Sequence, residues 1–260
     1  MVVLLKQNQF NVCASLRIGS VKFMLNQIKK EMLRLGDPER AKKLSNYFKT
    51  GKGQYAEGDV FLGIPVPQQR EVAKRYANLS LDDVQELLKS EIHEHRFTAL
   101  LILISKYGKA NSTNKEEIFN FYLKNSCYIN NWDLVDLSAP KIVGDYLTHR
   151  ERSTLFKLAR SNILWERRIA VLATAAFIRS NDFEDALAIV KLLLFDENDL
   201  IHKAVGWMLR EIGKRDQELL EKFLDKYKSR MPRTMLRYSI EKFREDKRKY
   251  YLNNSNSQQK

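Results

Sequence analysis

The chain has 260 residues, 44% of them hydrophobic, and 45 Lys and Arg against 32 Asp and Glu give it a formal net charge of +13. This is the composition of an ordinary globular protein, which excludes the disordered and fibrous classes, and no apolar run reaches the roughly 18 residues of a membrane-spanning helix. The excess of positive charge indicates a polyanionic partner, and among such partners a nucleic acid is the main candidate. Two lone cysteines, Cys13 and Cys127, favour a reducing cytoplasm.

Residues 1–23 show no helical stripe and are expected to form an extension outside the fold. An arm, a strand-like extension and an upstream misreading of a start at Met24 all remain open. The pattern is helical nearly throughout residues 24–250, which we expect to form a single domain, and the polar residues 251–260 are expected to be a disordered tail.

Two helix starts are clear near the beginning of this domain. Asp37 precedes Pro38, and Ser80 precedes an acidic first turn, so both residues are predicted N-caps. Between them, residues 50–67 are rich in Gly and Pro and are predicted to be a loop without the spacing of a phosphate-binding P-loop. We prefer a plain connector over the alternative, a flexible basic loop near a ligand.

Three segments resemble one another: "HEHRFTALLILI" from His93, "WERRIAVLATAA" from Trp165 and "LIHKAVGWMLRE" from Leu200. Each is expected to open the second helix of a helical pair. Their alignment brings Arg96, Arg168 and Lys203 into register, with Trp132 midway between the first two. Repeats of about 35 residues with two helices each predict an all-α, HEAT-like helical-repeat solenoid whose concave face is basic and binds the partner.

The segment "LIHKAVGWMLREIGK" predicts an amphipathic helix with Ile201, Val205, Met208, Leu209 and Ile212 on its buried stripe. At about 100° per residue, Trp207 lies on the opposite side together with three cations, Lys203, Arg210 and Lys214. Cations for phosphates and a flat ring for a sugar or base suit a nucleic acid. The alternative is that Trp207 packs against a neighbouring repeat.

Arg168 lies in a helix that is apolar on almost every side, so its charge requires a partner. A phosphate and a structural carboxylate are both plausible, and the repeat register favours the phosphate. Trp165, at the start of the same helix, is expected to pack there.

The stretch "NNWDLVDLS" predicts a helix with Asn131 as its N-cap and Asp133 in its first turn. Trp132 and Asp136 are four residues apart, so they share a face. An acid on a basic, anion-binding face requires a reason, and two remain open: a salt bridge to Arg168, or a carboxylate that faces a cationic group. The sequence shows neither a set of metal ligands nor a nucleophile motif, so we expect no metal and no cofactor.

With "SNYFKTGKGQYAEGDVFLGIPVPQQR", "NNWDLVDLSAPKIVGDYL", "LWERRIAVLATAAF" and "IHKAVGWMLREIGKRD", the chain resembles the DNA alkylation repair family of AlkD-like HEAT-repeat DNA glycosylases over about residues 24–245. The resemblance implies excision of N3- and N7-alkylated purines from duplex DNA without a deep base-flipping pocket. It implies that Asp136 is the catalytic carboxylate and that Trp132 and Trp207 flank the lesion nucleotide. It also implies that Arg168 and Arg210 contact the DNA backbone and that Tyr47 is an aromatic residue at the cleft.

An alkylated purine is already a cation and leaves without a general acid, so an ionised Asp136 has to stabilise the cationic sugar and position a water. We therefore expect a monomeric DNA-alkylpurine N-glycosylase of the bacterial cytoplasm that acts on alkylated double-stranded DNA. The alternatives are a non-catalytic protein that binds bent or branched DNA and a HEAT-repeat scaffold for an acidic protein. The expected site residues are Asp136, Trp132 and Trp207 for catalysis, and Tyr47, Arg168, Lys203, Arg210 and Lys214 for DNA binding.

Overall fold

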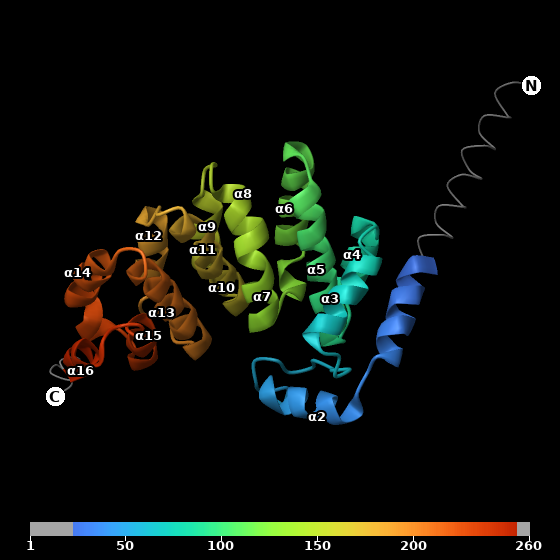
Figure 1. The fold of residues 1–260 in the computed structure, drawn as a ribbon, viewed down its shortest axis with the longest axis horizontal. Coiled ribbons are helices and arrows are strands. Elements are labelled where there is room, and N and C mark those ends of the chain that lie inside the picture. The colour runs from blue at the N-terminus through green and yellow to red at the C-terminus, as the bar shows by residue number, and fades with distance from the viewer. Residues whose placement is uncertain (1–22, 254–260) are drawn as a thin grey trace, which may run out of the picture. The chain divides into compact units, whose positions relative to one another are not determined.

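The structure is a computed structural model that describes residues 23–253 (Figure 1). In this part of the chain it contains helices and an isolated bridge between Val60 and Ile92, but no strand. The α-helices cover residues 23–34, α2 (Pro38–Tyr47), α3 (Val66–Arg75), α4 (Leu81–Leu88), α5 (His93–Lys109), α6 (Ser112–Lys124), α7 (Trp132–Ala139), α8 (Asp145–Leu147), α9 (Ser153–Ala159), α10 (Leu164–Ala173), α11 (Ala175–Arg179), α12 (Glu184–Leu192), α13 (Asp199–Gly213), α14 (Gln217–Tyr227), α15 (Arg233–Ser239) and α16 (Glu245–Asn253). Two short 3-10 helices, η1 (Ser126–Tyr128) and η3 (Lys228–Arg230), and a π-helical segment, η2 (Pro140–Gly144), lie between them. The predicted all-α fold is confirmed, and none of the described helices has the length and apolar character needed to cross a membrane.

The predicted helix starts are confirmed by their capping hydrogen bonds. Asp37 Oδ1 accepts from the Arg40 amide at 3.1 Å, and Ser80 Oγ accepts from the Asp83 amide at 3.1 Å. Asn131 caps α7, where its Oδ1 accepts from the Trp132 amide at 2.8 Å. These polar residues satisfy amides that a helix leaves unpaired at its start.

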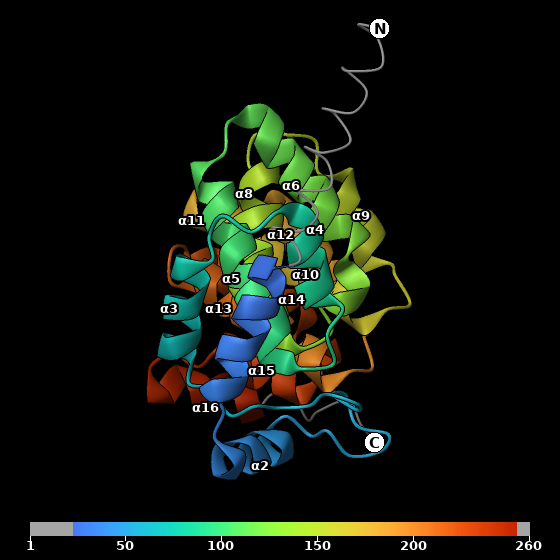
Figure 2. The same ribbon diagram turned by 90° about the vertical axis from the view of Figure 1, so that its right-hand side faces the viewer.

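The contacts divide the chain after Asn114 into two compact units, each of which is described by itself. In unit 1, α5 is the central helix and packs against α3 and α4 (Figures 1 and 2). Its residues from His93 to Leu100 are all buried. The single domain of residues 24–250 stays a prediction.

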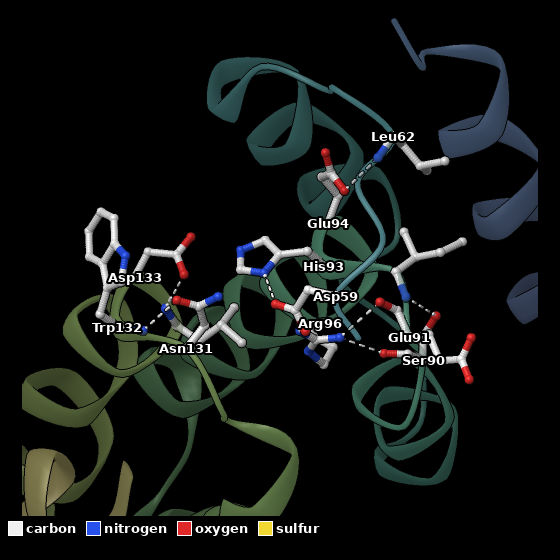
Figure 3. A network of polar contacts seen from close by, with 12 residues as sticks. Asp59, Leu62, Ser90, Glu91, His93, Glu94, Arg96, Asn131, Trp132 and Asp133 are labelled. Carbon is white, nitrogen blue, oxygen red and sulfur yellow. Dashed lines mark hydrogen bonds and ion pairs between the residues drawn. The ribbon is translucent and has the colours of Figure 1, made fainter. Parts of the chain in front are cut away.

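The loop of unit 1, residues 48–65, is fastened to the start of α5. Glu94, itself buried, accepts hydrogen bonds from the amides of Leu62 at 3.0 Å, Gly63 at 2.8 Å and Ile64 at 3.3 Å (Figure 3). Gly63 has a φ of +85°, and a Cβ there would lie 2.2 Å from the Asp37 carbonyl oxygen, so only glycine fits. The last residues of the loop are therefore fixed, although their sequence predicted only a connector.

In unit 2, the second helices of successive pairs lie next to one another in chain order. The helix α10 packs against α7 on one side and α13 on the other, while α9 and α12 pair with α10 and α13 (Figure 1). The predicted apolar stripe of α13 is buried, and Trp165 is buried at the start of α10, as expected. This order of helical pairs agrees with the predicted HEAT-like repeats.

The N-caps give the register of the repeats and correct the alignment made from sequence. The N-caps of α5, α7, α10 and α13 are residues 92, 131, 163 and 198. Counted from them, Asp136, Arg168 and Lys203 each occupy the fifth position, whereas Arg96 occupies the fourth and Trp132 the first. The expected alignment of Arg96 and Trp132 with Arg168 and Lys203 is therefore wrong.

Hydrogen bonds at the fourth position identify the true counterparts of Arg96. Arg96 Nη1 donates to the carbonyl of Ser90 at 2.8 Å, and Arg167 Nη1 donates to that of Ser161 at 3.0 Å. His202 Nε2 makes the corresponding bond to the carbonyl of Asp196, again six residues earlier. The doublet of adjacent arginines in "WERR" misled the alignment, because either arginine matches by residue type.

The end of the described chain differs from the expected tail. The helix α16 continues to Asn253, and Tyr251 is buried, with its ring 5.7 Å from that of Phe243. Residues 251–253 therefore belong to a helix and not to the expected tail. Residues 1–22 and 254–260 lie outside the described part of the chain.

Candidate active site

Asp136 and Arg168 form a bidentate ion pair between α7 and α10. Arg168 donates from Nε to Asp136 Oδ1 at 2.9 Å and from Nη2 to Asp136 Oδ2 at 2.8 Å. The parallel geometry is the strongest that an arginine and a carboxylate adopt. The buried Arg168 thus has a carboxylate partner, one of the two kinds expected from the sequence, and its contact with DNA phosphate stays a prediction.

The third nitrogen of the Arg168 guanidinium ties the pair to the next repeat. Its Nη1 donates to the Leu200 carbonyl in the first turn of α13 at 2.5 Å. The side chain of Arg168 is only 5% exposed. With its outer nitrogens engaged and almost no exposed surface, Arg168 can orient Asp136 but is poorly placed to bind DNA phosphate.

Asp136 remains open to a reacting group. Its side chain is 16% exposed, and each carboxylate oxygen has about two lone-pair directions, of which Arg168 uses one. Both oxygens accept hydrogen bonds, which is the pattern of an ionised carboxylate. The site therefore presents a fixed negative charge with free lone pairs.

Two opposing effects set the pKa of Asp136. Burial raises the pKa of the carboxyl above its ordinary value, and the Arg168 guanidinium acts in the opposite direction. The nearby charge of Asp133 raises it further. A carboxylate with a raised pKa is a better proton acceptor than an ordinary surface aspartate, which suits a general base.

Trp132 lies one turn before Asp136, at the first position of α7 (Figure 3). The side chain of Asp133 accepts from the Leu134 amide at 2.9 Å, which confirms its place in the first helical turn. The indole of Trp132 is partly exposed. Residues four apart on a helix share a face, so the ring and the catalytic candidate point to the same side of α7.

Trp207 and the cations of α13 also share a helix face, but this face contains acids that the sequence analysis left out. The Trp207 Nε1–H donates to Glu211 Oε1 at 3.0 Å, and Lys214 Nζ donates to the same carboxylate at 2.7 and 2.9 Å. Arg210 pairs with Glu241, and Lys203 lies 2.8 Å from Asp199. Each of the three cations therefore has an acidic partner in the structure.

Sequence spacing could have found two of these acids. Glu211 lies four residues after Trp207, and Asp199 lies four residues before Lys203, which are the separations at which helical side chains meet. The expected cluster of cations is present on α13, but its local charge is smaller than a count of Lys and Arg suggested.

Tyr47, the remaining expected residue, belongs to unit 1. Its ring is 65% exposed at the end of α2 and packs edge-on against Phe48, with the ring centroids 5.2 Å apart. Phe48 in turn stacks on Phe61 at 5.0 Å and contacts the ring of His93 at 5.0 Å. The exposed ring of Tyr47 thus packs on a cluster of aromatic rings formed by Phe48, Phe61 and His93.

A buried cluster of charged residues fixes His93, a member of this aromatic cluster. Asp59 Oδ2 lies 3.1 Å from His93 Nδ1, and Asp59 Oδ1 accepts from Arg96 Nη2 at 2.5 Å (Figure 3). All three side chains are about 5% exposed or less. No pattern in the sequence predicts this cluster, because Asp59 lies in a loop more than 30 residues before its partners.

Known structures and families provide an independent comparison. The chain is similar to a predicted DNA alkylation repair enzyme from Enterococcus faecalis, with 18% identity, a TM-score of 0.64 and coverage of 81% of this chain and 97% of that one. It is also similar to AlkD2 from Streptococcus mutans, with 16% identity, a TM-score of 0.50 and coverage of 80% and 98%. At these identities the likeness concerns the fold.

No curated protein gives a significant match. The model of the family described as "DNA alkylation repair enzyme" matches residues 28–243, which include all of the expected site residues. The chain therefore belongs to the DNA alkylation repair enzyme family.

Proposed function

We propose that the protein is a DNA glycosylase that hydrolyses the N-glycosidic bond of positively charged N3- and N7-alkylated purines in duplex DNA. It acts as a monomer in the cytoplasm. Family membership supports a role in alkylation repair. The observation that carries the finer proposal is the carboxylate of Asp136, which is fixed by Arg168 through both oxygens and still partly exposed.

The chemistry of the substrate makes one fixed carboxylate sufficient. An N3- or N7-alkylpurine carries a positive charge, so the base departs as a neutral leaving group without prior protonation. The sugar left behind develops the positive charge of an oxocarbenium ion. Catalysis then needs a negative charge close to the sugar and a base for the attacking water.

Asp136 supplies both functions in this proposal. Its charge stabilises the cationic sugar, and a free lone pair accepts the proton of the water that attacks the anomeric carbon. The bidentate bond from Arg168 fixes the direction of the carboxylate, so little reorganisation is required during the reaction. In this proposal Arg168 acts as a positioning residue for Asp136.

The aromatic and basic residues hold the damaged nucleotide and its strand. The rings of Trp132 and Trp207 have electron-rich faces that attract a cationic base or sugar. Lys203, Arg210 and Lys214 bind backbone phosphates, for which they exchange their intramolecular acids. Tyr47 offers an exposed ring for contact with the DNA.

The direct test is release of 7-methylguanine from methylated duplex DNA by the wild type and by Asp136→Asn. We expect the single-turnover rate to fall by about 100-fold or more, because the variant loses both the charge and the base. Asp133→Asn is the matched control, since it makes the same change three residues earlier on the same helix, and it is expected to retain most of the rate. Undiminished release by Asp136→Asn, with both variants folded by circular dichroism, would refute the role of Asp136.

A DNA-binding protein without base excision is the second candidate. The ion pair itself favours it, because Asp136 could serve only to neutralise the buried Arg168. That protein would bind duplex or branched DNA in a salt-dependent manner and release no base from any methylated substrate. The same release assay therefore separates the two candidates.

A further inference from the structure

Glu211 is an acid on the face of α13 that carries Trp207 and the cations. Its carboxylate accepts one hydrogen bond from the Trp207 indole at 3.0 Å and two from Lys214 at 2.7 and 2.9 Å. The Arg210 Nε lies 3.6 Å away. A negative charge there repels DNA phosphates and neutralises the neighbouring cations, so it weakens DNA binding. Its presence on this face needs a positive reason.

The hydrogen bond to the indole supplies that reason. The Nε1–H group is the one donor of a tryptophan side chain, and the ring torsion of tryptophan has a broad energy profile. A partly exposed indole without such a bond can therefore turn about its Cβ–Cγ bond. A bond from Nε1 to a fixed acceptor restricts this rotation and determines which face of the ring is presented to solvent.

The acceptor is itself fixed. Lys214 bonds to both oxygens of Glu211, so the carboxylate lies between an indole and an ammonium group on a single helix face. The three residues are spaced at i, i+4 and i+7, which places them in a row along α13. The side chain of Glu211 is 28% exposed, so it also keeps contact with solvent.

We infer that Glu211 is a positioning residue that holds the indole of Trp207 in the orientation required to face the lesion nucleotide. The inference rests on the proposed function for its effect on the rate, but the orientation of the ring can be measured without catalysis. It predicts opposite effects on two quantities. Loss of Glu211 lowers the excision rate because the ring is misdirected, and it strengthens DNA binding because a negative charge is removed.

Two substitutions of Glu211 separate its effect on the orientation of the Trp207 ring from the effect of its negative charge. Glu211→Ala removes the acceptor and the charge, whereas Glu211→Gln removes the charge and keeps an oxygen that can accept from Nε1. We expect the single-turnover rate of Glu211→Ala to fall by about tenfold, the scale of a modest misalignment, and that of Glu211→Gln to stay within about threefold of the wild type. The dissociation constant for undamaged duplex should be lower in both variants, because both remove the negative charge.

The orientation of the ring is read from the indole resonances. The three tryptophans give three indole ¹⁵N–¹H signals, and Trp207→Phe identifies that of Trp207. In Glu211→Ala this signal should shift and its proton should exchange faster with water, while Glu211→Gln should retain the protection. Glu241→Ala is the matched control: it removes an acid that pairs with Arg210 on the same surface, and it should leave the Trp207 signal in place.

An unchanged Trp207 signal in Glu211→Ala would overturn the inference, as would a Glu211→Gln protein that behaves like Glu211→Ala. A wild-type protein that releases no base would instead overturn the proposed glycosylase activity. The indole signals would still decide whether Glu211 orients Trp207, so the two failures are distinguishable.

Discussion

Unit 1 and unit 2 each contain an arginine, Arg96 in α5 and Arg168 in α10, that donates to an aspartate from another segment of the same unit. In unit 1, Asp59 is 5% exposed and is shared by Arg96 and His93. In unit 2, Asp136 is 16% exposed and has Arg168 as its bidentate partner. The first carboxylate is enclosed by its partners, whereas the second retains exposed surface and unused lone pairs. The same pair of residue types thus suits a structural role in one place and a chemical role in the other.

The largest effect on stability is expected from Asp59→Asn. This substitution leaves the charge of the buried Arg96 without its carboxylate, which typically costs about 3–5 kcal/mol of the free energy of unfolding. Urea denaturation measures the change, and Asp82→Asn, on the exposed start of α4, serves as the control. A loss of free energy of unfolding below about 1 kcal/mol would contradict the structural role of the Asp59 cluster in unit 1.

His95 gives unit 1 a second, pH-dependent test. Burial, followed by the charges of Lys29 and Arg96, lowers the pKa of His95 from 6.5 to about 4. The unfolded chain therefore binds this proton more tightly than the native protein, and stability falls as the pH decreases from 6.5 towards 4. The contribution is about 3 kcal/mol at 1.36 kcal/mol per pKa unit. His95→Gln should show a shallower acid dependence in urea denaturation, and equal slopes would contradict the prediction.

The pH dependence of base release tests the open carboxylate of unit 2. In the proposed mechanism Asp136 acts only when ionised, and burial raises its pKa. Below that pKa the rate should fall by about tenfold per pH unit, and the fall should begin at a higher pH than for an ordinary aspartate. A single-turnover pH profile with 7-methylguanine measures this. A rate that is flat down to the pKa of an ordinary aspartate would contradict the assignment.

The smallest effect is expected from Lys203→Ala, because this lysine already pairs with Asp199 and is exposed. We expect a several-fold weaker affinity for duplex DNA, and a slope of log K against log salt that is smaller by about 0.9, as for the loss of one phosphate contact. Lys222→Ala removes an exposed lysine from α14 and should leave the slope unchanged. Equal slopes for all three proteins would exclude Lys203 from the DNA interface.

Features that depend on neighbouring residues could be predicted from the sequence. The caps at Asp37, Ser80 and Asn131 follow from short polar side chains before a helical pattern, and the buried stripe of α13 follows from its period. The need of Arg168 for a partner followed from its apolar helix, and a carboxylate was one of the two partners considered. The caps and the stripe are local features, and the burial of the Arg168 charge is evident from the apolar residues around it in the helix.

Features that depend on pairing between distant segments could not be predicted from the sequence. Two sets of hydrogen bonds join the loop to α5 across more than 30 residues. Glu94 accepts from the amides of Leu62 and Gly63, and Arg96 donates to Asp59. The register failed at Arg96 because residue types were aligned without reference to the caps. Glu211 is a different case: its spacing of four residues from Trp207 is visible in the sequence, but a count of Lys and Arg on α13 omits it.

The hydrogen bonds of the Arg168 guanidinium also determine where this chain tolerates an insertion or a deletion. Its three bonds require the fifth position of α10 to face α7 while the first turn of α13 faces α10. One residue inserted after the cap of α10 would turn the guanidinium by about 100° away from both partners. Grafting this site onto another helical-repeat protein would accordingly require three consecutive repeats that keep the spacing from each helix cap to Asp136, Arg168 and Leu200.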